Sequence, residues 1–149
     1  MAMQHLLFIV LISSVIHAAS STSGNFTLDG TTVTAYDILE QNNLPRGLLP
    51  LGVKSYVLHE GTVEVTLPGE CNFFVSLGGD QYKFRYGSKV GGVIKSGSLT
   101  HVYGVRFQAI SEWLGLNTVE RVGDQLKFQA QTLAESFPVS SFARSPSCN

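Results

Sequence analysis

Apolar and polar residues alternate through the middle of the chain, between Val53 and Phe107. From residue 82 to residue 86, for example, tyrosine or phenylalanine fills each even position and lysine or arginine fills each odd one. Side chains of a strand point alternately to its two faces, so this pattern predicts strands with one buried and one wet face. Glycine-bearing turns interrupt the pattern at short intervals, as in antiparallel hairpins. We therefore expect an all-β fold, mainly an antiparallel barrel or sandwich.

The individual strands follow from the same alternation. We expect them at residues 53–58, 63–67, 71–77, 82–86, 89–95, from 99 as far as 113, 119–122 and 126–130, with turns at Gly87-Ser88 and Gly123-Asp124 among others. Turns at this spacing favour a meander, and a two-residue Gly-Asp turn is typical of a hairpin. In the long strand, a period of two places six residues on one face, namely Leu99, His101, Tyr103, Val105, Phe107 and Ala109.

One short helix is expected before the sheet, packed on it. Thr31 or Thr32 caps its start, because a threonine hydroxyl accepts a hydrogen bond from a free N–H group of the first turn. Asn42-Asn43 ends it, because asparagine tolerates the left-handed conformation of a helix stop. The connector at residues 44–52 contains two prolines and four leucines. This composition indicates a buried plug at one end of the sheet, with a ligand-gating loop as the alternative.

The start of the chain has the features of a signal peptide. Leu6 to Ile12 form a continuous apolar run, followed by small residues at a cleavage point. This run is shorter than the roughly 20 apolar residues that span a bilayer. We expect a signal peptide at residues 1–19, a flexible mature N-terminus at residues 20–30 and a single β-barrel-like domain at residues 31–149. An uncleaved anchor is the alternative.

A secreted chain makes two further features relevant. Asn25 begins an Asn-Phe-Thr sequon and is a candidate N-glycosylation site. Cys71 and Cys148 are the two cysteines of the chain, and an even number of cysteines in an oxidising compartment usually forms bridges. Such a bridge ties the C-terminal tail to an early strand and stabilises the fold by about 4 kcal/mol through loop-closure entropy. Two separate buried thiols are the alternative.

Several short patterns together resemble one plant family. They are Tyr36-Asp37-Ile38-Leu39, Asn43-Leu44-Pro45-Arg46-Gly47-Leu48-Leu49-Pro50, Gly69-Glu70-Cys71, Val90-Gly91-Gly92-Val93-Ile94-Lys95-Ser96-Gly97, Tyr103-Gly104-Val105 before Trp113, and Phe137-Pro138 with Pro146-Ser147-Cys148. In this combination, essentially the whole mature chain resembles the family called Domain of Unknown Function 538. The resemblance implies a compact β-barrel-like domain of a plant, secreted to the apoplast or cell wall. It implies no catalytic residues, because the family has no settled activity. A likeness of its sheet to bactericidal permeability-increasing lipid-binding proteins has been proposed, and so has hydrolase activity.

Positive charge is concentrated in one segment of an otherwise near-neutral chain, whose net charge is −1. Between Asp80 and Glu112 there is no acidic residue, and the cations there are Lys83, Arg85, Lys89, Lys95 and Arg106. We expect hairpin pairing to gather them on a wet face. The favoured interpretation of this patch is a solvated face whose lysines prevent edge-to-edge aggregation. The functional alternative is contact with lipid headgroups or acidic cell-wall polysaccharide. The small net charge gives no field that attracts nucleic acid.

Aromatic residues dominate the expected buried face. They are Phe73, Tyr82, Phe84, Tyr86, Tyr103, Phe107 and Phe128. These side chains are suited to line a cavity for an amphipathic molecule, because ligand pockets are mainly apolar. They are equally suited to fill a small barrel completely.

Cofactor and enzyme chemistry have little support in the sequence. His59 and His101 lie on different expected elements and have no ligand-spaced partner, so we expect no metal site. No glycine-rich strand-to-helix turn is present, so we expect no nucleotide cofactor. A serine hydrolase site requires Ser96 or Ser98 together with His101 and Asp80, but no Gly-x-Ser-x-Gly elbow accompanies them.

Three hypotheses of function remain. The first is a non-catalytic binding module for an amphipathic or anionic ligand, either a lipid or a cell-wall component, and the sequence favours it. The second is a small secreted ester hydrolase. The third is a wall-associated structural or interaction protein that uses the same positive face.

Overall fold

The structure is a computed structural model that describes residues 26–28, 31–109 and 111–149. The expected signal peptide at residues 1–19 and the sequon at Asn25 lie outside these ranges. Residues 26–28 belong to the segment expected to be flexible, and they form a strand that pairs with residues 31–33. Within the described ranges, none of the helices has the length and apolar character needed to cross a bilayer.

The described elements follow one another with short connections. They are β1 (Phe26–Leu28), β2 (Thr31–Val33), α2 (Ala35–Gln41), the 3-10 helix η1 (Arg46–Leu48), β3 (Ser55–His59), β4 (Thr62–Thr66), β5 (Cys71–Leu77), β6 (Asp80–Lys95), β7 (Ser98–Ala109), β8 (Glu112–Gly115), β9 (Thr118–Val122), β10 (Gln125–Ala130), β11 (Leu133–Pro138) and the 3-10 helix η2 (Val139–Phe142).

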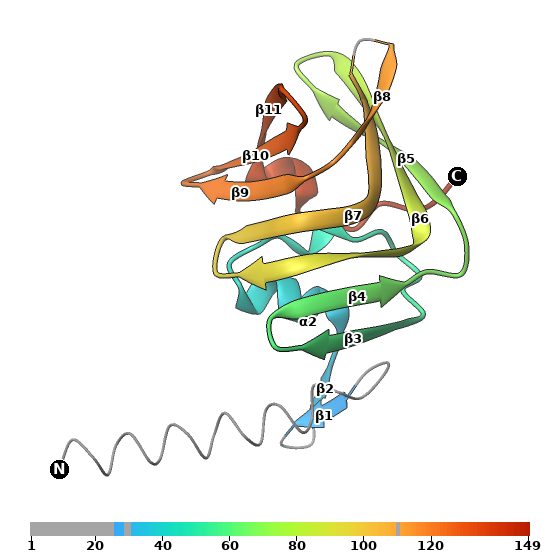
Figure 1. Cartoon of the computed structure of the whole chain (residues 1–149), viewed down its shortest axis with the longest axis vertical. Coiled ribbons are helices and arrows are strands. Elements are labelled where there is room, and N and C mark those ends of the chain that lie inside the picture. The colour runs from blue at the N-terminus through green and yellow to red at the C-terminus, as the bar shows by residue number, and fades with distance from the viewer. Residues whose placement is uncertain (1–25, 29–30, 110) are drawn as a thin grey trace, which may run out of the picture.

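One antiparallel sheet forms the body of the molecule (Figure 1). Its two long strands, β6 and β7, pair with each other, and each changes its second partner along its length. Residues 89–93 of β6 pair with β4, whereas residues 80–86 pair with β5. Residues 98–99 of β7 pair with β9, whereas residues 106–109 pair with β8. The sheet therefore divides into two arms that share β6 and β7.

We call these parts the first and the second arm. The first arm contains β3, β4, residues 89–95 of β6, residues 98–103 of β7, and β9 to β11. The second arm contains β5, residues 80–86 of β6, residues 105–109 of β7, and β8. The expected fold class, mainly antiparallel β with one helix near the N-terminus, is confirmed. The sheet path runs from β11 to β3 and does not close, so this is an open, bent sheet.

Three details of the expected strand layout are wrong. The strand that begins near residue 99 does not continue to Trp113, because β7 ends at Ala109 and Trp113 lies on the antiparallel strand β8. The predicted turn at Gly87-Ser88 is absent, because β6 continues without a break from Asp80 to Lys95. The predicted meander is interrupted as well, because β4 and β5 both pair with β6 rather than with each other. In contrast, β9 and β10 form the predicted hairpin around Gly123-Asp124.

Strand β7 bends where the two arms meet. His101 has a φ of 51° and Gly104 has a φ of 82°, and the register between β6 and β7 shifts beside them. A side chain at Gly104 would place its Cβ 2.3 Å from the carbonyl oxygen of Lys89, so only glycine fits there. The irregularity breaks the period of two, and both His101 and Tyr103 are exposed. The prediction that they share the buried face of β7 is therefore wrong.

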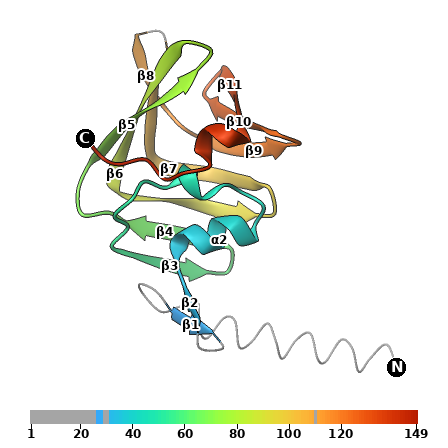
Figure 2. The same cartoon turned by 180° about the vertical axis from the view of Figure 1, so that it is seen from behind.

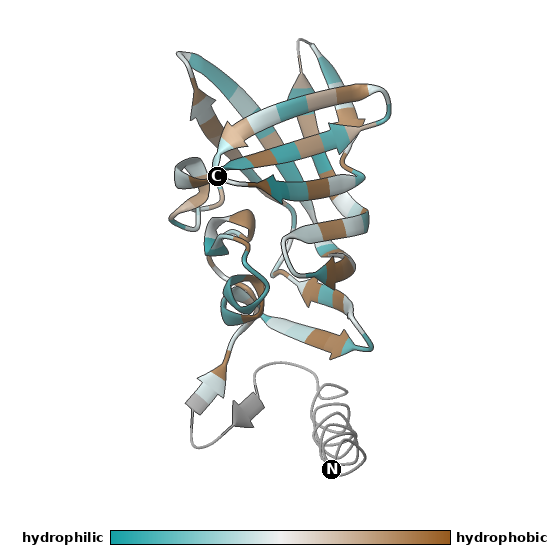
Figure 3. Ribbon diagram, turned by 90° about the vertical axis from the view of Figure 1, so that its left-hand side faces the viewer, coloured by the Kyte–Doolittle hydropathy of each residue, from teal (hydrophilic) through white to brown (hydrophobic). Residues whose placement is uncertain are grey.

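Aromatic rings fill the space between the second arm and the β10–β11 hairpin. Phe84 is fully buried at the centre of this layer. Its ring centroid lies 5.5 to 6.3 Å from five others, those of Phe73, Phe107, Phe128, Phe137 and Phe142. The rings meet in stacked, tilted and edge-to-face arrangements, which stabilise the core beyond simple burial. Figure 3 shows the alternation of hydrophobic and hydrophilic residues along the strands that produces this layer.

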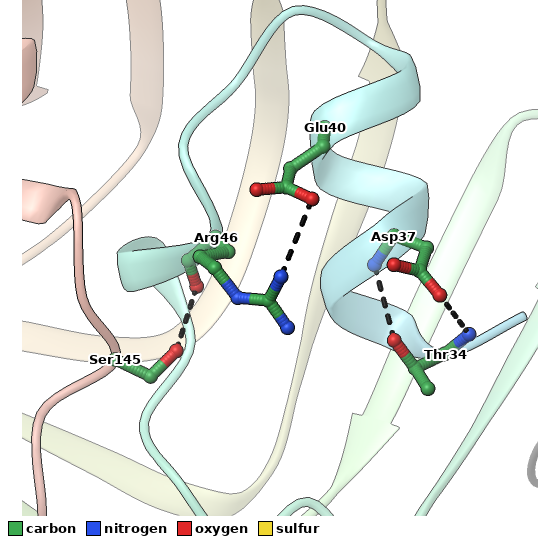
Figure 4. Close-up of polar contacts among 5 residues, drawn as sticks. All are labelled: Thr34, Asp37, Glu40, Arg46 and Ser145. Carbon is green, nitrogen blue, oxygen red and sulfur yellow. Dashed lines mark hydrogen bonds and ion pairs between the residues drawn. The ribbon is translucent and has the colours of Figure 1, made fainter.

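Helix α2 covers the inner face of the first arm (Figure 2). Thr34 caps it: its hydroxyl accepts a hydrogen bond from the Asp37 N–H at 3.2 Å, and the Asp37 carboxylate accepts one from the Thr34 N–H at 2.9 Å (Figure 4). The predicted cap at Thr31 or Thr32 is wrong, because these residues belong to β2. The predicted end is confirmed, with Asn42 as the C-cap and the next residue at a φ of 61°.

The connector after α2 packs against the C-terminal tail. Leu44, Leu48 and Leu49 are buried in it, while Leu51 is 53% exposed. The carbonyl oxygen of Arg46 accepts a hydrogen bond from the Ser145 hydroxyl at 3.1 Å (Figure 4). The connector is therefore the packed plug that the sequence predicts, held between the helix and the tail.

A disulfide fixes the tail to the second arm. Cys71, the first residue of β5, is bonded to Cys148, as predicted. The N–H group of Asn149 donates a hydrogen bond to the carbonyl oxygen of Asn72 at 2.9 Å. The last residues therefore lie along the edge of β5 that faces away from β6.

Candidate functional site

The outer face of the second arm carries two arginines on neighbouring strands. Arg85 on β6 lies directly opposite Arg106 on β7. Asn72 on β5 lies opposite Arg85, and Gly115 on β8 lies opposite Arg106. These four residues form one row across the arm, on the side turned away from the aromatic core.

A neighbouring row on the same face combines a lysine with two aromatic side chains. It contains Phe74, Lys83, Gln108 and Trp113. Lys83 Nζ lies 5.8 Å from the centroid of the Phe74 ring, and Phe74 is 46% exposed. We call the two rows together the basic-aromatic face.

Arg85 is held in place from two directions. Its Cζ lies 4.4 Å from the centroid of the Trp113 ring, within the range of a cation–π contact. Its Nε donates a hydrogen bond to Asn72 Oδ1 at 3.2 Å. Because the planar guanidinium is fixed by the ring and the amide, its terminal N–H groups are preoriented for a carboxylate or phosphate.

An open groove of about 490 Å³ borders the arginine row at the junction of the two arms. Its polar side chains are Arg85, Arg106, Glu70, Asn117 and Tyr103, and three glycines, Gly87, Gly104 and Gly115, line it as well. A second depression of about 240 Å³ lies along β5 and β6, and Phe74, Lys83 and Trp113 border it. Arg85 lines both hollows.

The positive charge of the basic-aromatic face is balanced only in part, by Glu70 on the groove that Arg85 and Arg106 also line. In the described part of the chain, the ion pairs join Arg46 to Glu40, His59 to Glu60 and Lys89 to Glu64. They involve none of the three cations on this face. Like charges directly opposite each other on neighbouring strands destabilise a sheet. Trp113 and Asn72 hold Arg85 in place, but no ion pair of the described residues offsets the repulsion between Arg85 and Arg106.

Two of the five predicted patch cations lie elsewhere. Lys89 belongs to the first arm, where its Nζ lies 3.8 Å from the Glu64 carboxylate and 3.2 Å from the Thr66 hydroxyl. Lys95 ends β6 opposite Ser98, at the far end of the strand. The bend in β6 and β7 separates both from the other three, so the patch reduces to Lys83, Arg85 and Arg106.

Tyr103, predicted to line an interior cavity, lies on the outside of the first arm instead. Its ring lies across Gly91, where a Cβ atom would come within 2.6 Å of the tyrosine hydroxyl. That hydroxyl donates a hydrogen bond of 2.6 Å to the Glu64 carboxylate. Partial burial, the hydrogen bond and the charge of Glu64 together raise the pKa of Tyr103 to about 12. Tyr103 thus joins β7 to β4 across β6.

A small apolar cavity of about 60 Å³ lies between α2 and the first arm. Pockets for small organic ligands usually measure about 300 to 1,000 Å³. Of the residues predicted as a ligand lining, Tyr86 and Phe128 border this cavity. Phe73, Phe84 and Phe107 stack on one another, and Tyr82 packs edge-on against Phe137 at 5.1 Å. The aromatic side chains of the second arm therefore pack against each other instead of surrounding a ligand-sized space.

Tyr86 instead links the sheet to the connector. Its hydroxyl donates a hydrogen bond to the carbonyl oxygen of Leu48 at 2.5 Å, and burial raises its pKa.

The structure does not bring together the proposed hydrolase residues. Asp80 begins β6 and Ser96 follows its last residue, so a strand of 16 residues separates them. His101 lies exposed at the bend of β7. In the described residues, no group of three or more histidine, cysteine, aspartate or glutamate side chains gathers as metal ligands do.

Sequence reasoning missed Asn72, Phe74, Glu70, Trp113 and Asn117, which complete the face and the groove. Asn72 and Phe74 lie on the predicted strand at residues 71–77, but β8, which carries Trp113, was not predicted as a separate strand. The tight turn between β5 and β6 carries one usable signal. Pairing outward from Gly78-Gly79 puts Phe74 opposite Lys83 and Asn72 opposite Arg85.

The fold and the site together define an all-β domain with an open, bent sheet and a basic outer face. The family model described as "Protein of unknown function, DUF538" matches residues 35–143, well over half of the chain. The chain belongs to this family, as its sequence patterns indicated. Comparison with curated proteins gave no match, and neither did comparison with solved structures.

Proposed function

We propose that this protein is a non-catalytic binding module that recognises an anionic group of an extracellular ligand. The groove of about 490 Å³ beside Arg85 and Arg106 is the binding site. The ligand is an anionic lipid headgroup or an acidic polysaccharide of the cell wall. Secretion is part of the proposal, and the Cys71–Cys148 bridge is compatible with an oxidising compartment.

The observation that supports this proposal is the pairing of Arg85 with Arg106 on adjacent strands, where neither forms an ion pair with any residue that the structure describes. Two cationic side chains at opposite positions of adjacent strands repel each other, and an anion bound between them relieves that repulsion. Hydrogen bonds from arginine to a carboxylate or phosphate are charge-assisted and often bidentate. The stacking of Arg85 on Trp113 lowers the entropy lost when such an anion binds.

The interior supports the surface site indirectly. A cavity of about 60 Å³ is too small for a lipid chain or a sugar ring. Binding at the outer face requires no opening of the aromatic core, so the module recognises its ligand with the fold unchanged.

The test is a binding titration with the variant Arg85→Gln/Arg106→Gln against anionic vesicles and an anionic polysaccharide. We expect binding to at least one of them, and a loss of at least about tenfold in the double variant. Lys95→Gln/Lys127→Gln removes the same charge from exposed positions outside the groove and is the matched control. Equal binding by both double variants would remove the arginine pair from the proposal.

A further inference from the structure

We propose that the groove at the junction of the arms takes an acidic oligosaccharide, a chain of sugar units that carry carboxylates. This inference rests on the proposed function, because it names the ligand of the same site. It states that the ligand is a chain of uronic acids and not a free phosphate or a lipid headgroup.

The polar groups of the groove fit a ligand that carries both negative charge and hydroxyl groups. Arg85 and Arg106 supply donors for a carboxylate. Glu70, exposed on the same groove, has an acceptor-only side chain when ionised. A sugar hydroxyl donates a hydrogen bond to such a carboxylate, whereas an inorganic phosphate dianion is repelled by it. Asn117 adds an amide that both donates and accepts.

The shape of the site favours an extended ligand. Gly87, Gly104 and Gly115 leave part of the groove without side chains, and a Cβ at Gly115 would meet no atom within 4 Å. Arg85 connects this groove with the depression along Phe74 and Trp113. Four strands about 4.8 Å apart give the face a width on the order of 14 Å, which exceeds a single sugar ring. An oligosaccharide can therefore cross the arginines and reach the aromatic row, where rings of Phe74 and Trp113 offer apolar surface to its C–H groups.

The same face is poorly suited to a membrane. The exposed large apolar side chains in the described residues are Leu51, Val57, Phe74, Tyr103 and Val122. Of these, Phe74 belongs to the basic-aromatic face, and Tyr103 borders the groove with its hydroxyl bonded to Glu64. Three cations and one phenylalanine attract an anionic bilayer weakly, since each basic residue near the surface contributes little and salt screens it.

The first experiment compares four probes by calorimetric titration of the native protein. They are a short oligogalacturonate, the same oligomer fully methyl-esterified, inorganic phosphate, and vesicles with phosphatidylserine. We expect the acid oligomer to bind, and the uncharged ester to bind at least about tenfold more weakly. Phosphate and vesicles are expected to bind more weakly than the acid oligomer.

Each other outcome overturns a defined part of the argument. Equal binding of the acid and the ester contradicts recognition of the carboxylate. Preferred binding of phosphate or vesicles leaves the proposed function standing and overturns the present inference. No binding of any probe by the folded protein overturns both.

Two variants place the ligand in the groove. Gly115→Leu fills the groove without changing its charge, and we expect it to abolish binding of the acid oligomer. Thr62→Leu adds the same side chain at an exposed position on β4 and is the control.

Glu70→Gln keeps the shape of the groove and removes one negative charge, so it is expected to weaken oligomer binding and strengthen phosphate binding. The ligand does not lie in the groove if Glu70→Gln changes the dissociation constants of the oligomer and of phosphate in the same direction. The same conclusion follows if Gly115→Leu binds the oligomer normally.

Discussion

The two faces of the second arm are formed by the same strands but differ in their effect on stability. On the inner face, Phe84 of β6 lies opposite Phe107 of β7, and both side chains are fully buried. Arg85, which follows Phe84, lies opposite Arg106, which precedes Phe107, and this pair is on the outer face. The inner pair attracts and the outer pair repels. The inner face of these strands therefore supplies most of their stability. The outer face retains a repulsion between arginines, and a bound anionic ligand can relieve it.

The largest expected effect concerns the inner face. Phe84→Ala removes the ring at the centre of the aromatic layer, and we expect it to lower the free energy of unfolding by about 3 to 5 kcal/mol. Phe74→Ala, on the outer face of the adjacent strand, is the control and is expected to cost less than about 1 kcal/mol. Denaturant unfolding of both variants measures the difference. Similar losses for the two would mean that the layer is not the main source of stability.

The next effect compares two glycines on the outer side of the sheet. Gly91→Ala places a Cβ 2.3 Å from the Val63 carbonyl oxygen and under the Tyr103 ring, so we expect a loss of about 1 to 3 kcal/mol. Gly115→Ala meets open space and is expected to change stability by no more than about 1 kcal/mol, in the stabilising direction. Thermal and denaturant unfolding test both. A large loss in Gly115→Ala would contradict the open groove.

A smaller effect involves pH. The pKa of Tyr103 is about 12 in the folded protein, above its ordinary value of 10. A raised pKa means that the fold favours the neutral phenol, so this stabilisation is complete below pH 10 and is lost as the pH rises through 12. Tyr103→Phe removes the hydrogen bond to Glu64, for a loss of up to about 1 kcal/mol at neutral pH.

The stability difference between the native protein and Tyr103→Phe should therefore shrink between pH 10 and pH 12. Tyr82 and Tyr86, whose pKa values are also raised, are present in both proteins, and their contribution cancels. A difference that stays constant over this range would show that Tyr103 titrates normally.

The smallest expected effect is a gain in the free energy of unfolding, not a loss. Arg106→Gln relieves the repulsion from Arg85, and we expect the ligand-free protein to gain up to about 0.5 kcal/mol at low salt. The gain should fade at high salt, because screening shortens the range of the repulsion. Lys95→Gln, at the far end of β6, is the control. A loss of more than about 1 kcal/mol in Arg106→Gln would assign this side chain a role in stability and weaken the contrast between the faces.

Much of the fold follows from local patterns in the sequence. Alternation identified β3 to β7, β9 and β10 but not β1, β2, β8 or β11. The Gly-Asp turn identified the β9–β10 hairpin, and the cysteine count identified the bridge. The errors occur where distant segments decide local structure. Thr31 and Thr32 resemble helix caps, but pairing with residues 26–28 makes them a strand. His101 adopts a left-handed conformation that no period of two anticipates.

The candidate site was predicted in part. Lys83, Arg85 and Arg106 share a face because of alternation and hairpin pairing, which are local rules. Lys89 has the same parity as Arg85, but it falls beyond the bend and lies beside Glu64. The groove itself depends on the change of partner of β7 from β9 to β8. That change is a property of the tertiary structure, so neither Asn117 nor Glu70 could be assigned to the groove from spacing.

The uninterrupted course of β6 from Asp80 to Lys95 constrains how this protein can change. Substitutions can alter the arginines and the phenylalanines separately, since each set faces its own side. An insertion or deletion of a single residue between Arg85 and Tyr86 has a different result, because it would turn Lys83 and Arg85 toward the interior and Phe84 toward water. We therefore expect β6 to tolerate insertions and deletions far less well than substitutions on its outer face.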